Sequence, residues 1–496
     1  MFEKITPEVA GLPSSEISRF INYLNDNSLA THALLLMRGD KIFTEAYWKP
    51  FHKDFIHRQY SQTKSFVGIA IGLLISDGKL SLDDKIVDLF PEKIDDIDKV
   101  SERLRSQTVR NMLTMSTVND DRWWFLAGDP DRTHLYLNGR DFDRVPGALW
   151  RYDSSGSQVL SSLVEKLAGM PLLEFLRARL FSHMGTFKTA KILKTPNGDS
   201  WGDSAMLSTP RDMASFAKLL MDGGKWEGKQ LIDADYVREA TSKIVGNSEE
   251  RYASVFGNGY GYQIWRTPRD GFACLGMGGQ MTIAIPSKQL IFVINSDTQG
   301  NASAYDLIVN GFLSFVVDRI DDEPLPCDDR ALEKLENQIS ELELIALKGD
   351  VDQKLMAEVN GATYECEDNR LGMTKFRFDF DGDGGKFVYT NGQGDKILPF
   401  GINKNVFGKF PQLGYSNDVG GELTTDGFMY NDAVSLRFER ENKIQLRVQV
   451  IDQYFGNFLA TFAFCEGKAV CKFSAIGEYF LREYDGEFIA YKKENM

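Results

Sequence analysis

A serine and a lysine three positions apart stand at the start of an apolar segment, HRQYSQTKSFVGIAIGLLISDGK (57–79). If this segment is a helix, Ser61 and Lys64 lie on one face, one turn apart. A serine hydroxyl is a poor nucleophile until a base takes its proton. Enclosure by apolar groups lowers the pKa of a lysine from about 10.4, so that a neutral amine becomes available as that base. The pair therefore suits a serine acyl-enzyme, although two polar residues at a helix start fit the spacing equally well.

The SxxK spacing alone does not decide between these interpretations. About two matches are expected by chance in a chain of this composition and length, and the sequence contains three. Ser76 and Lys79 fall at a helix end, and Ser215 and Lys218 lie inside an amphipathic helix. Only Ser61 and Lys64 stand at an expected helix start that is followed by an apolar helix and preceded by a strand hairpin. A serine at a helix start also has backbone N–H groups nearby that favour an oxyanion.

The surrounding pattern predicts a mixed domain in which one sheet is built from both ends of a long segment. Expected strands are a hairpin over 31–48, the segment GYGYQIW (259–265) and a second hairpin over 281–295. Expected helices include 14–27, 62–76, 208–224 and 303–317, and the region 80–245 is mostly helical. Strands at the ends with helices between them predict an α+β fold (an α/β sandwich) with an inserted helical lobe.

The chain of 496 residues is long enough for two domains. We expect the first over 1–320 and a linker with a packed helix over 321–350, starting at the polar, proline-bearing DDEPLPCDD. The remaining residues, 351–496, alternate aromatic and polar side chains between glycines. They predict a C-terminal all-β domain, either barrel-like or sandwich-like.

Six ordered segments resemble the serine β-lactamase and penicillin-recognising superfamily. They are YSQTKSFVGIAIGLLISDGKLSLDDKIVDLFPE, VRNMLTMST, WRYDSSGSQVLSSLVEKLAGM, LSTPRDMASFAKLLMDGG, GYGYQIW and GMGGQMTIAIPSKQLIFVINSD. The resemblance covers about residues 10–318. It is closest to the class C β-lactamase-related branch, which includes esterases, D-amino-acid peptidases and hydrolases of aminohexanoate oligomers. It implies a β-lactamase-like domain with an antiparallel sheet.

The resemblance assigns roles to individual residues. Ser61 matches the acylated nucleophile, Lys64 its base partner, and Tyr152 the tyrosine that shares proton transfer. Ser154 stands where the branch usually has asparagine and is expected to bind a substrate carbonyl. For Tyr152 taken alone, a buried tyrosine with a bonded hydroxyl is the competing interpretation.

The third motif departs from the family. Where relatives carry Lys-Thr-Gly or His-x-Gly, this chain reads Met277-Gly278-Gly279-Gln280, without the cation that binds a substrate carboxylate. Gly278 and Gly279 still allow a strand edge to approach the substrate. We expect the backbone N–H groups of Ser61 and Gln280 to form the oxyanion hole.

Trp123 and Trp124 fall in the inserted lobe, where an apolar substrate wall is the expectation and a core cluster the alternative. The predicted function is a serine hydrolase of a small ester, amide or short peptide. The alternatives are a non-catalytic ligand-binding protein of this fold, and a weak β-lactamase or D-amino-acid peptidase. We expect no cofactor and no metal, since the five histidines show no metal spacing and DFDGDG (379–384) reads better as a hairpin turn than as a calcium loop.

The net charge of −14 argues against nucleic acid and anionic membranes as partners. The start of the chain lacks the pattern of a secretory signal, no apolar run is long enough to span a bilayer, and the five cysteines show no CxxC spacing. A cytoplasmic protein with free thiols is expected. The oligomeric state is left open.

Overall fold

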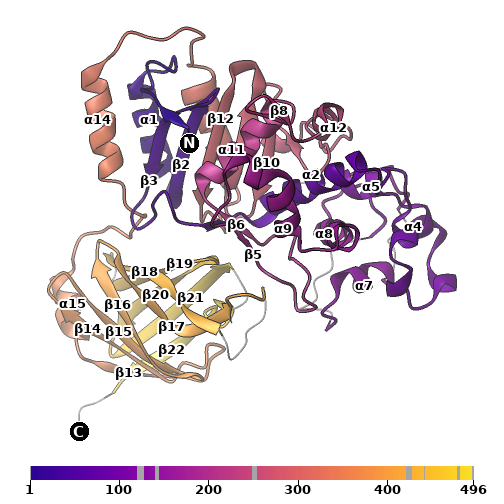
Figure 1. Cartoon of the computed structure of the whole chain (residues 1–496). Coiled ribbons are helices and arrows are strands. Elements are labelled where there is room, and N and C mark those ends of the chain that lie inside the picture. Colours follow the sequence, from indigo (N-terminus) through magenta and orange to yellow (C-terminus); the bar gives the residue numbers. More distant parts are fainter. Residues whose placement is uncertain are drawn as a thin grey trace. The chain divides into compact units, whose positions relative to one another are not determined.

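The computed structural model describes residues 2–119, 128–139, 144–248, 254–420, 427–440, 442–477 and 481–493. The chain forms two compact units (Figure 1). The first comprises Met1–Glu343 with Asp418–Gly420, and the second Leu344–Asn417 with Gly421–Met496. The first unit therefore includes the helix that we assigned to the linker.

The first unit is built on a sheet that joins the two ends of its sequence. In the described residues its strand order is β1-β3-β2-β12-β11-β10-β9. Neighbouring strands are antiparallel except β1 and β3, which are parallel. The strands are β1 (Glu3–Lys4), β2 (Thr31–Arg38), β3 (Lys41–Tyr47), β9 (Trp265–Arg266), β10 (Phe272–Gly276), β11 (Gln280–Ile285) and β12 (Leu290–Ser296).

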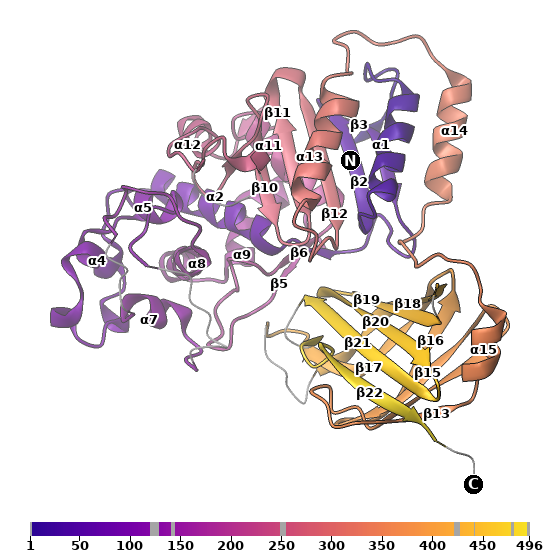
Figure 2. The same ribbon diagram turned by 180° about the vertical axis from the view of Figure 1, so that it is seen from behind.

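Helices cover both faces of this sheet (Figure 2), which explains why β2 is an unbroken apolar run rather than an alternating one. Leu35 and Met37 point into a core shared with α2, α8 and α11, whereas Leu34 and Leu36 point into a second core shared with α1 and α13. These helices are α1 (Ser14–Asp26), α2 (Thr63–Ser76), α8 (Ser154–Ala168), α11 (Pro210–Met221) and α13 (Ala304–Phe312), which continues as the π-helical turn η7 (Leu313–Val317). The former linker helix, α14 (Asp329–Ser340), packs on α1, where Gln338 Nε2 donates to Asn22 Oδ1 at 2.8 Å.

In the sequence, the inserted lobe lies between α2 and the strands β9 to β12. Its described elements are α3 (Ile86–Leu89), η2 (Pro91–Lys93), η3 (Ile97–Lys99), α4 (Glu102–Ser106), α5 (Val109–Leu113), α7 (Arg132–Leu137), α8, α9 (Leu172–Leu176), η4 (Arg177–Phe181) and α10 (Ser182–Met184). A small sheet of β4 (His57–Arg58), β6 (Met206–Ser208) and β5 (Lys191–Ile192) joins the lobe to the start of α2. In the residues that the structure describes, the unit also contains α12 (Ala234–Ala240), η5 (Ser254–Phe256), η6 (Pro286–Lys288), β7 (Lys225–Trp226) and β8 (Lys229–Gln230).

The second unit is a barrel, which resolves the choice between barrel and sandwich. Nine of its described strands pair in a closed ring, because β16 pairs with β18 as well as with β15. The tenth strand, β17, pairs with β18. After α15 (Gln353–Val359) the strands are β13 (Thr363–Cys366), β14 (Lys375–Asp381), β15 (Gly384–Asn391), β16 (Gly394–Ile402), β17 (Val406–Ser416), β18 (Gly427–Glu439), β19 (Lys443–Ile451), β20 (Phe455–Cys465), β21 (Lys468–Gly477) and β22 (Gly486–Lys492).

Two local predictions have different outcomes. The DFDGDG segment forms the tight turn between β14 and β15, as the hairpin interpretation predicted. The strand expected over 259–265 is wrong except at its last residue, Trp265, which begins β9. Gln263 has a positive φ of 59° there, which breaks an extended strand. No helix in the described residues is long and apolar enough to cross a bilayer.

Candidate active site

Ser61 lies in a single 3-10 turn, η1 (Tyr60–Gln62), that leads directly into α2. Tyr60 adopts a positive φ of 47°, an uncommon conformation for a bulky residue that costs of the order of 1 kcal/mol. Two hydrogen bonds hold this turn: Thr63 Oγ1 donates to Tyr60 O at 2.6 Å, and Met206 N donates to Thr63 Oγ1 at 3.0 Å. The turn thus presents Ser61 at the partly exposed start of an otherwise buried helix.

Lys64 is hydrogen-bonded to this hydroxyl. Its Nζ lies 3.0 Å from Ser61 Oγ and donates a second hydrogen bond to the backbone oxygen of Asp203 at 2.7 Å. The residue is only 1% exposed. The structure therefore brings together the serine and lysine that the sequence paired, at a separation suited to direct proton transfer.

Tyr152 approaches the same lysine from the start of α8. Lys64 Nζ lies 5.1 Å from the centroid of its ring, and the half-buried ring stacks on Trp265 at 6.0 Å. The next residue, Asp153, caps α8 by accepting from Gly156 N at 2.8 Å and also accepts from Thr117 Oγ1 at 2.7 Å. This cap fixes the backbone that carries Tyr152 beside the serine–lysine pair.

Ser154 is placed less favourably for contact with substrate. Ser154, the first residue of α8, is buried, with an exposed fraction of 3%. Trp123 and Trp124 lie outside the described residues.

The glycines of the third motif form the turn between β10 and β11. Gly278 and Gly279 have φ values of 78° and 86°. A Cβ on Gly279 would lie inside the contact distance of Ser296 Oγ, so this turn requires glycine. Met277, at 43% exposed, presents an apolar side chain at the position where the sequence resemblance led us to expect a cation in relatives.

Gln280 does not fulfil the expectation of an oxyanion donor at a free strand edge. It begins β11, which lies between β10 and β12, and its buried side chain braces the turn by accepting from Asn295 Nδ2 at 2.9 Å and donating to Ser296 O. The pairing of β10 with β9 ends at Ala273, so the open backbone edge belongs to 274–276. A Cβ on Gly276 would collide with the backbone oxygen of Gln59, which places this edge beside the Ser61 turn.

Two titratable groups near the turn are unsuited to compete with Lys64. Burial lowers the pKa of His57 to about 3, and its ring packs among Phe51 and Phe55. Burial raises the pKa of Cys274 to about 12, so this thiol is neutral. The His57 ring is therefore part of the packing that precedes Ser61.

Sequence reasoning missed Asp203 and Arg132. The carboxylate of Asp203 forms a fully buried ion pair with Arg132 and accepts from Trp201 Nε1 at 2.9 Å. Both residues stand in segments without a motif, and 71 positions separate them. The feature that marks this pair is that both charged side chains are buried. A single sequence does not show burial, so no signal pointed to them.

The fold and this arrangement define a class. The β-lactamase family model matches residues 18–310, and the chain belongs to that family of serine hydrolases. The second unit lies outside the matched residues.

The chain is similar to several named proteins. Over 271 residues the chain is 26% identical to the 6-aminohexanoate-dimer hydrolase of Paenarthrobacter ureafaciens, covering 50% of this chain and 68% of that protein. It is 27% identical over 171 residues to esterase EstB of Burkholderia gladioli, covering 31% and 42%. A solved structure, the putative 6-aminohexanoate-dimer hydrolase from Bacillus anthracis, matches with a TM-score of 0.53 at 18% identity, covering 64% of this chain and 86% of that one. This structural likeness concerns the fold alone.

Proposed function

We propose that the chain hydrolyses a small ester or amide through an acyl-enzyme on Ser61. The observation that carries the proposal is the 3.0 Å separation between Lys64 Nζ and Ser61 Oγ in a buried setting. A lysine enclosed in this way serves as a base if its amine is neutral. The names of two relatives, one an amide hydrolase and one an esterase, support the same pair of substrate classes.

In the first step Ser61 Oγ attacks the substrate carbonyl carbon while its proton moves to Lys64 Nζ. The tetrahedral oxyanion is held by the Ser61 N–H and a backbone N–H on the open edge at 274–276. The bond to the leaving alcohol or amine then breaks, and the departing group takes a proton by way of Tyr152. Water next attacks the acyl carbon and gives up a proton to the same groups. The bond between the acyl carbon and Ser61 Oγ then breaks, the acid leaves, and Ser61 Oγ takes that proton back.

The exposed Met277 favours uncharged substrates over β-lactams, which carry a carboxylate. Without a cation at this position, a substrate carboxylate has to lose hydration without gaining a charge-assisted hydrogen bond there. We therefore expect neutral acyl esters and amides to be turned over faster than penicillins. A panel of acyl esters, aminohexanoate oligomers, D-amino amides and β-lactams tests this order.

A fluorophosphonate probe tests the nucleophile directly. Wild-type protein should be labelled and Ser61→Ala should not, whereas Ser215→Ala, which alters another SxxK serine, should label like wild type. Tyr152→Phe should slow turnover by roughly 10²–10⁴-fold, the range for loss of general acid–base catalysis. Equal labelling of wild type and Ser61→Ala, or labelling of neither, would refute the acyl-enzyme.

A further inference from the structure

A buried ion pair lies directly behind the catalytic lysine. Arg132 is the first residue of α7, and Asp203 lies in the segment before β6. We propose that Arg132 and Asp203 form a positioning pair that fixes Lys64 and controls the protonation state in which it meets Ser61. This inference rests on the proposed function of Ser61.

Asp203 contacts the lysine and the arginine through different atoms. Its backbone oxygen accepts from Lys64 Nζ at 2.7 Å. Its carboxylate binds the Arg132 guanidinium, accepts from Trp201 Nε1 at 2.9 Å and accepts from Ser204 Oγ. The side-chain contacts of Asp203 therefore fix the position of the backbone oxygen that binds Lys64.

Arg132 also contacts the segment that carries the candidate tyrosine. Its Nε donates to Ser155 Oγ at 3.2 Å, in the first turn of α8 and three positions beyond Tyr152. A single guanidinium thus links the residue that holds Lys64 to the segment that holds Tyr152. These are the two groups to which we assign proton transfer.

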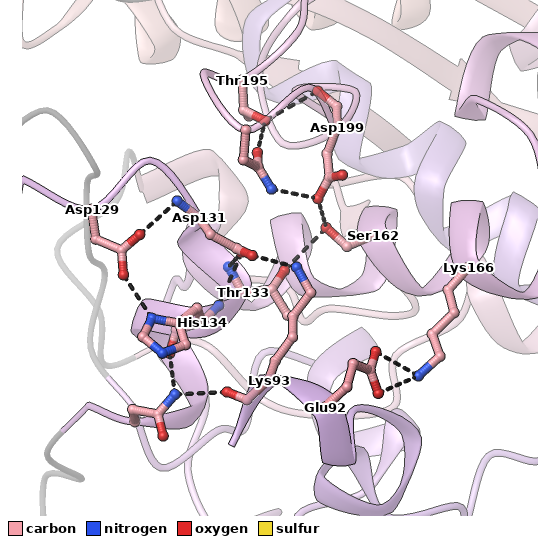
Figure 3. Close-up of polar contacts among 12 residues, drawn as sticks. Glu92, Lys93, Asp129, Asp131, Thr133, His134, Ser162, Lys166, Thr195 and Asp199 are labelled. Carbon is pink, nitrogen blue, oxygen red and sulfur yellow. Dashed lines mark hydrogen bonds and ion pairs between the residues drawn. The ribbon is translucent and has the colours of Figure 1, made fainter. Parts of the chain in front are cut away.

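The position of Arg132 is set by a network around the start of α7 (Figure 3). Asp131 caps this helix by accepting from Thr133 N and His134 N, both at 3.0 Å, and pairs with Lys93. Thr133 Oγ1 donates to Ser162 Oγ on α8 at 3.0 Å. Because both flanking residues are tied down, the arginine enters the site from a fixed backbone.

The charges of the pair matter because the Asp203 carboxylate belongs to the residue that Lys64 contacts. Paired with Arg132, this carboxylate is neutralised. Without the arginine it would stabilise an ammonium on Lys64, the form that cannot take the Ser61 proton. A buried ion pair adds little net stability compared with apolar side chains of similar volume, so stability alone gives a weak reason for its presence.

Other titratable and charged groups also lie near Lys64, and substitutions at Arg132 or Asp203 do not alter them. Tyr152 faces the lysine from the start of α8, the next residue Asp153 is held by the cap of that helix, and the Cys274 thiol on β10 is held neutral by burial. Arg58 on β4 is confined between aromatic rings, with its guanidinium carbon 4.5 Å from the centroid of Tyr60 and 4.6 Å from that of Trp201.

Opposite charge changes should shift the pH dependence in opposite directions. We would measure the rate of fluorophosphonate labelling from pH 5 to 10 in the full-length chain. Arg132→Gln leaves the carboxylate unpaired, so the midpoint of the rising limb should move up by about one pH unit or more. Asp203→Asn removes the carboxylate that neutralises the guanidinium charge beside Lys64, so the midpoint should move down. The double variant, which removes both charges, should return close to wild type.

Two controls separate this role from general destabilisation. Arg132→Lys keeps the charge and should restore most of the wild-type profile. Lys166→Ala removes an exposed ion pair with Glu92 in the same lobe and should not move the midpoint. Because Asp203→Asn and the double variant do not depend on an unpaired buried carboxylate, they test the proposal even if Arg132→Gln fails to fold.

Shifts in the same direction, or no shift in any folded variant, would overturn the positioning pair. If wild type is labelled and Ser61→Ala is not, such a result refutes the pair while leaving the acyl-enzyme intact. If labelling does not depend on Ser61, the acyl-enzyme and the pair both fail.

Discussion

The barrel contains a carboxyl group that should make its stability fall as pH rises. Asp432 points inward from β18, is 1% exposed, and its Oδ2 has no hydrogen-bond partner among the described residues. Burial raises its pKa to about 7, although a hydrogen bond from Gly408 N and the charge of Lys409 oppose the rise. In the unfolded chain an aspartate titrates near 3.9.

The difference between these two values sets the size of the effect. Between about pH 4 and 7 the folded protein holds one proton more than the unfolded chain, so the free energy of unfolding decreases as pH rises. Three pH units correspond to about 4 kcal/mol, as an upper bound. For a unit of this size that is roughly 10 °C in Tm.

Asp432→Asn removes the titration while keeping the shape of the side chain. The variant should match wild type near pH 4 and exceed its stability by up to about 4 kcal/mol at pH 8. Calorimetry measures both units, and tryptophan fluorescence identifies the transition of the first one, because all seven tryptophans precede residue 344.

The matched control is Asp383→Asn, in the exposed turn between β14 and β15. The pair with Lys404 lowers the pKa of Asp383, so its removal cannot produce a gain at high pH. If Asp432→Asn keeps the wild-type pH slope of the barrel transition, the pKa of this carboxyl is not raised by burial.

Three further predictions concern the first unit. Gly279→Ala should lower stability by about 1–2 kcal/mol, seen by thermal denaturation, and reduce kcat/KM, because an L-residue is strained at that φ and its Cβ would clash with Ser296 Oγ; an unchanged Tm would contradict the turn geometry. Glu45 is buried, which raises its pKa, but hydrogen bonds from Arg211 and Lys4 outweigh this and lower the value to about 2. The ionised Glu45 therefore adds to the free energy of unfolding above about pH 4.5, and this contribution is lost as pH falls towards 2. Glu45→Gln should lower the free energy of unfolding by about 2–3 kcal/mol at pH 7 and should match wild type in acid, as measured by urea denaturation at each pH. Met277→Lys should raise kcat/KM for carboxylate-bearing esters relative to neutral ones, as competition assays would show, whereas an unchanged ratio would place this side chain away from the substrate.

Contacts in the site could be predicted from the sequence where the two residues lie close together along the chain. Ser61 and Lys64 are three positions apart, on the turn η1 and on the helix α2 that continues from it, so local geometry brings them together. The Lys64–Asp203 contact joins residues 139 positions apart, and no local pattern specifies it. The role expected for Gln280 was misplaced because the position of a backbone N–H relative to a sheet edge depends on strand order, which one sequence does not reveal.

The fold shows the same division. Periodicity located four helices and the two apolar hairpins of the first unit, since amphipathic and alternating patterns are local, but it gave no bounds for the other helices of the inserted lobe. It failed at 259–265, where apolar and aromatic residues resemble a strand but Gln263 has a positive φ. The choice between barrel and sandwich was equally out of reach, because it depends on the pairing of β16 with β18.

The central place of β2 in the sheet has a consequence for synthesis of the chain. One edge of this apolar strand is paired by β3, which follows it at once, but the other edge waits for β12, whose last residue is Ser296. At roughly 5–20 residues per second, a ribosome needs on the order of 10–50 s to supply it. During that time the nascent chain carries an unpaired apolar edge that invites association with other chains. Fragments that end before β12 should therefore aggregate.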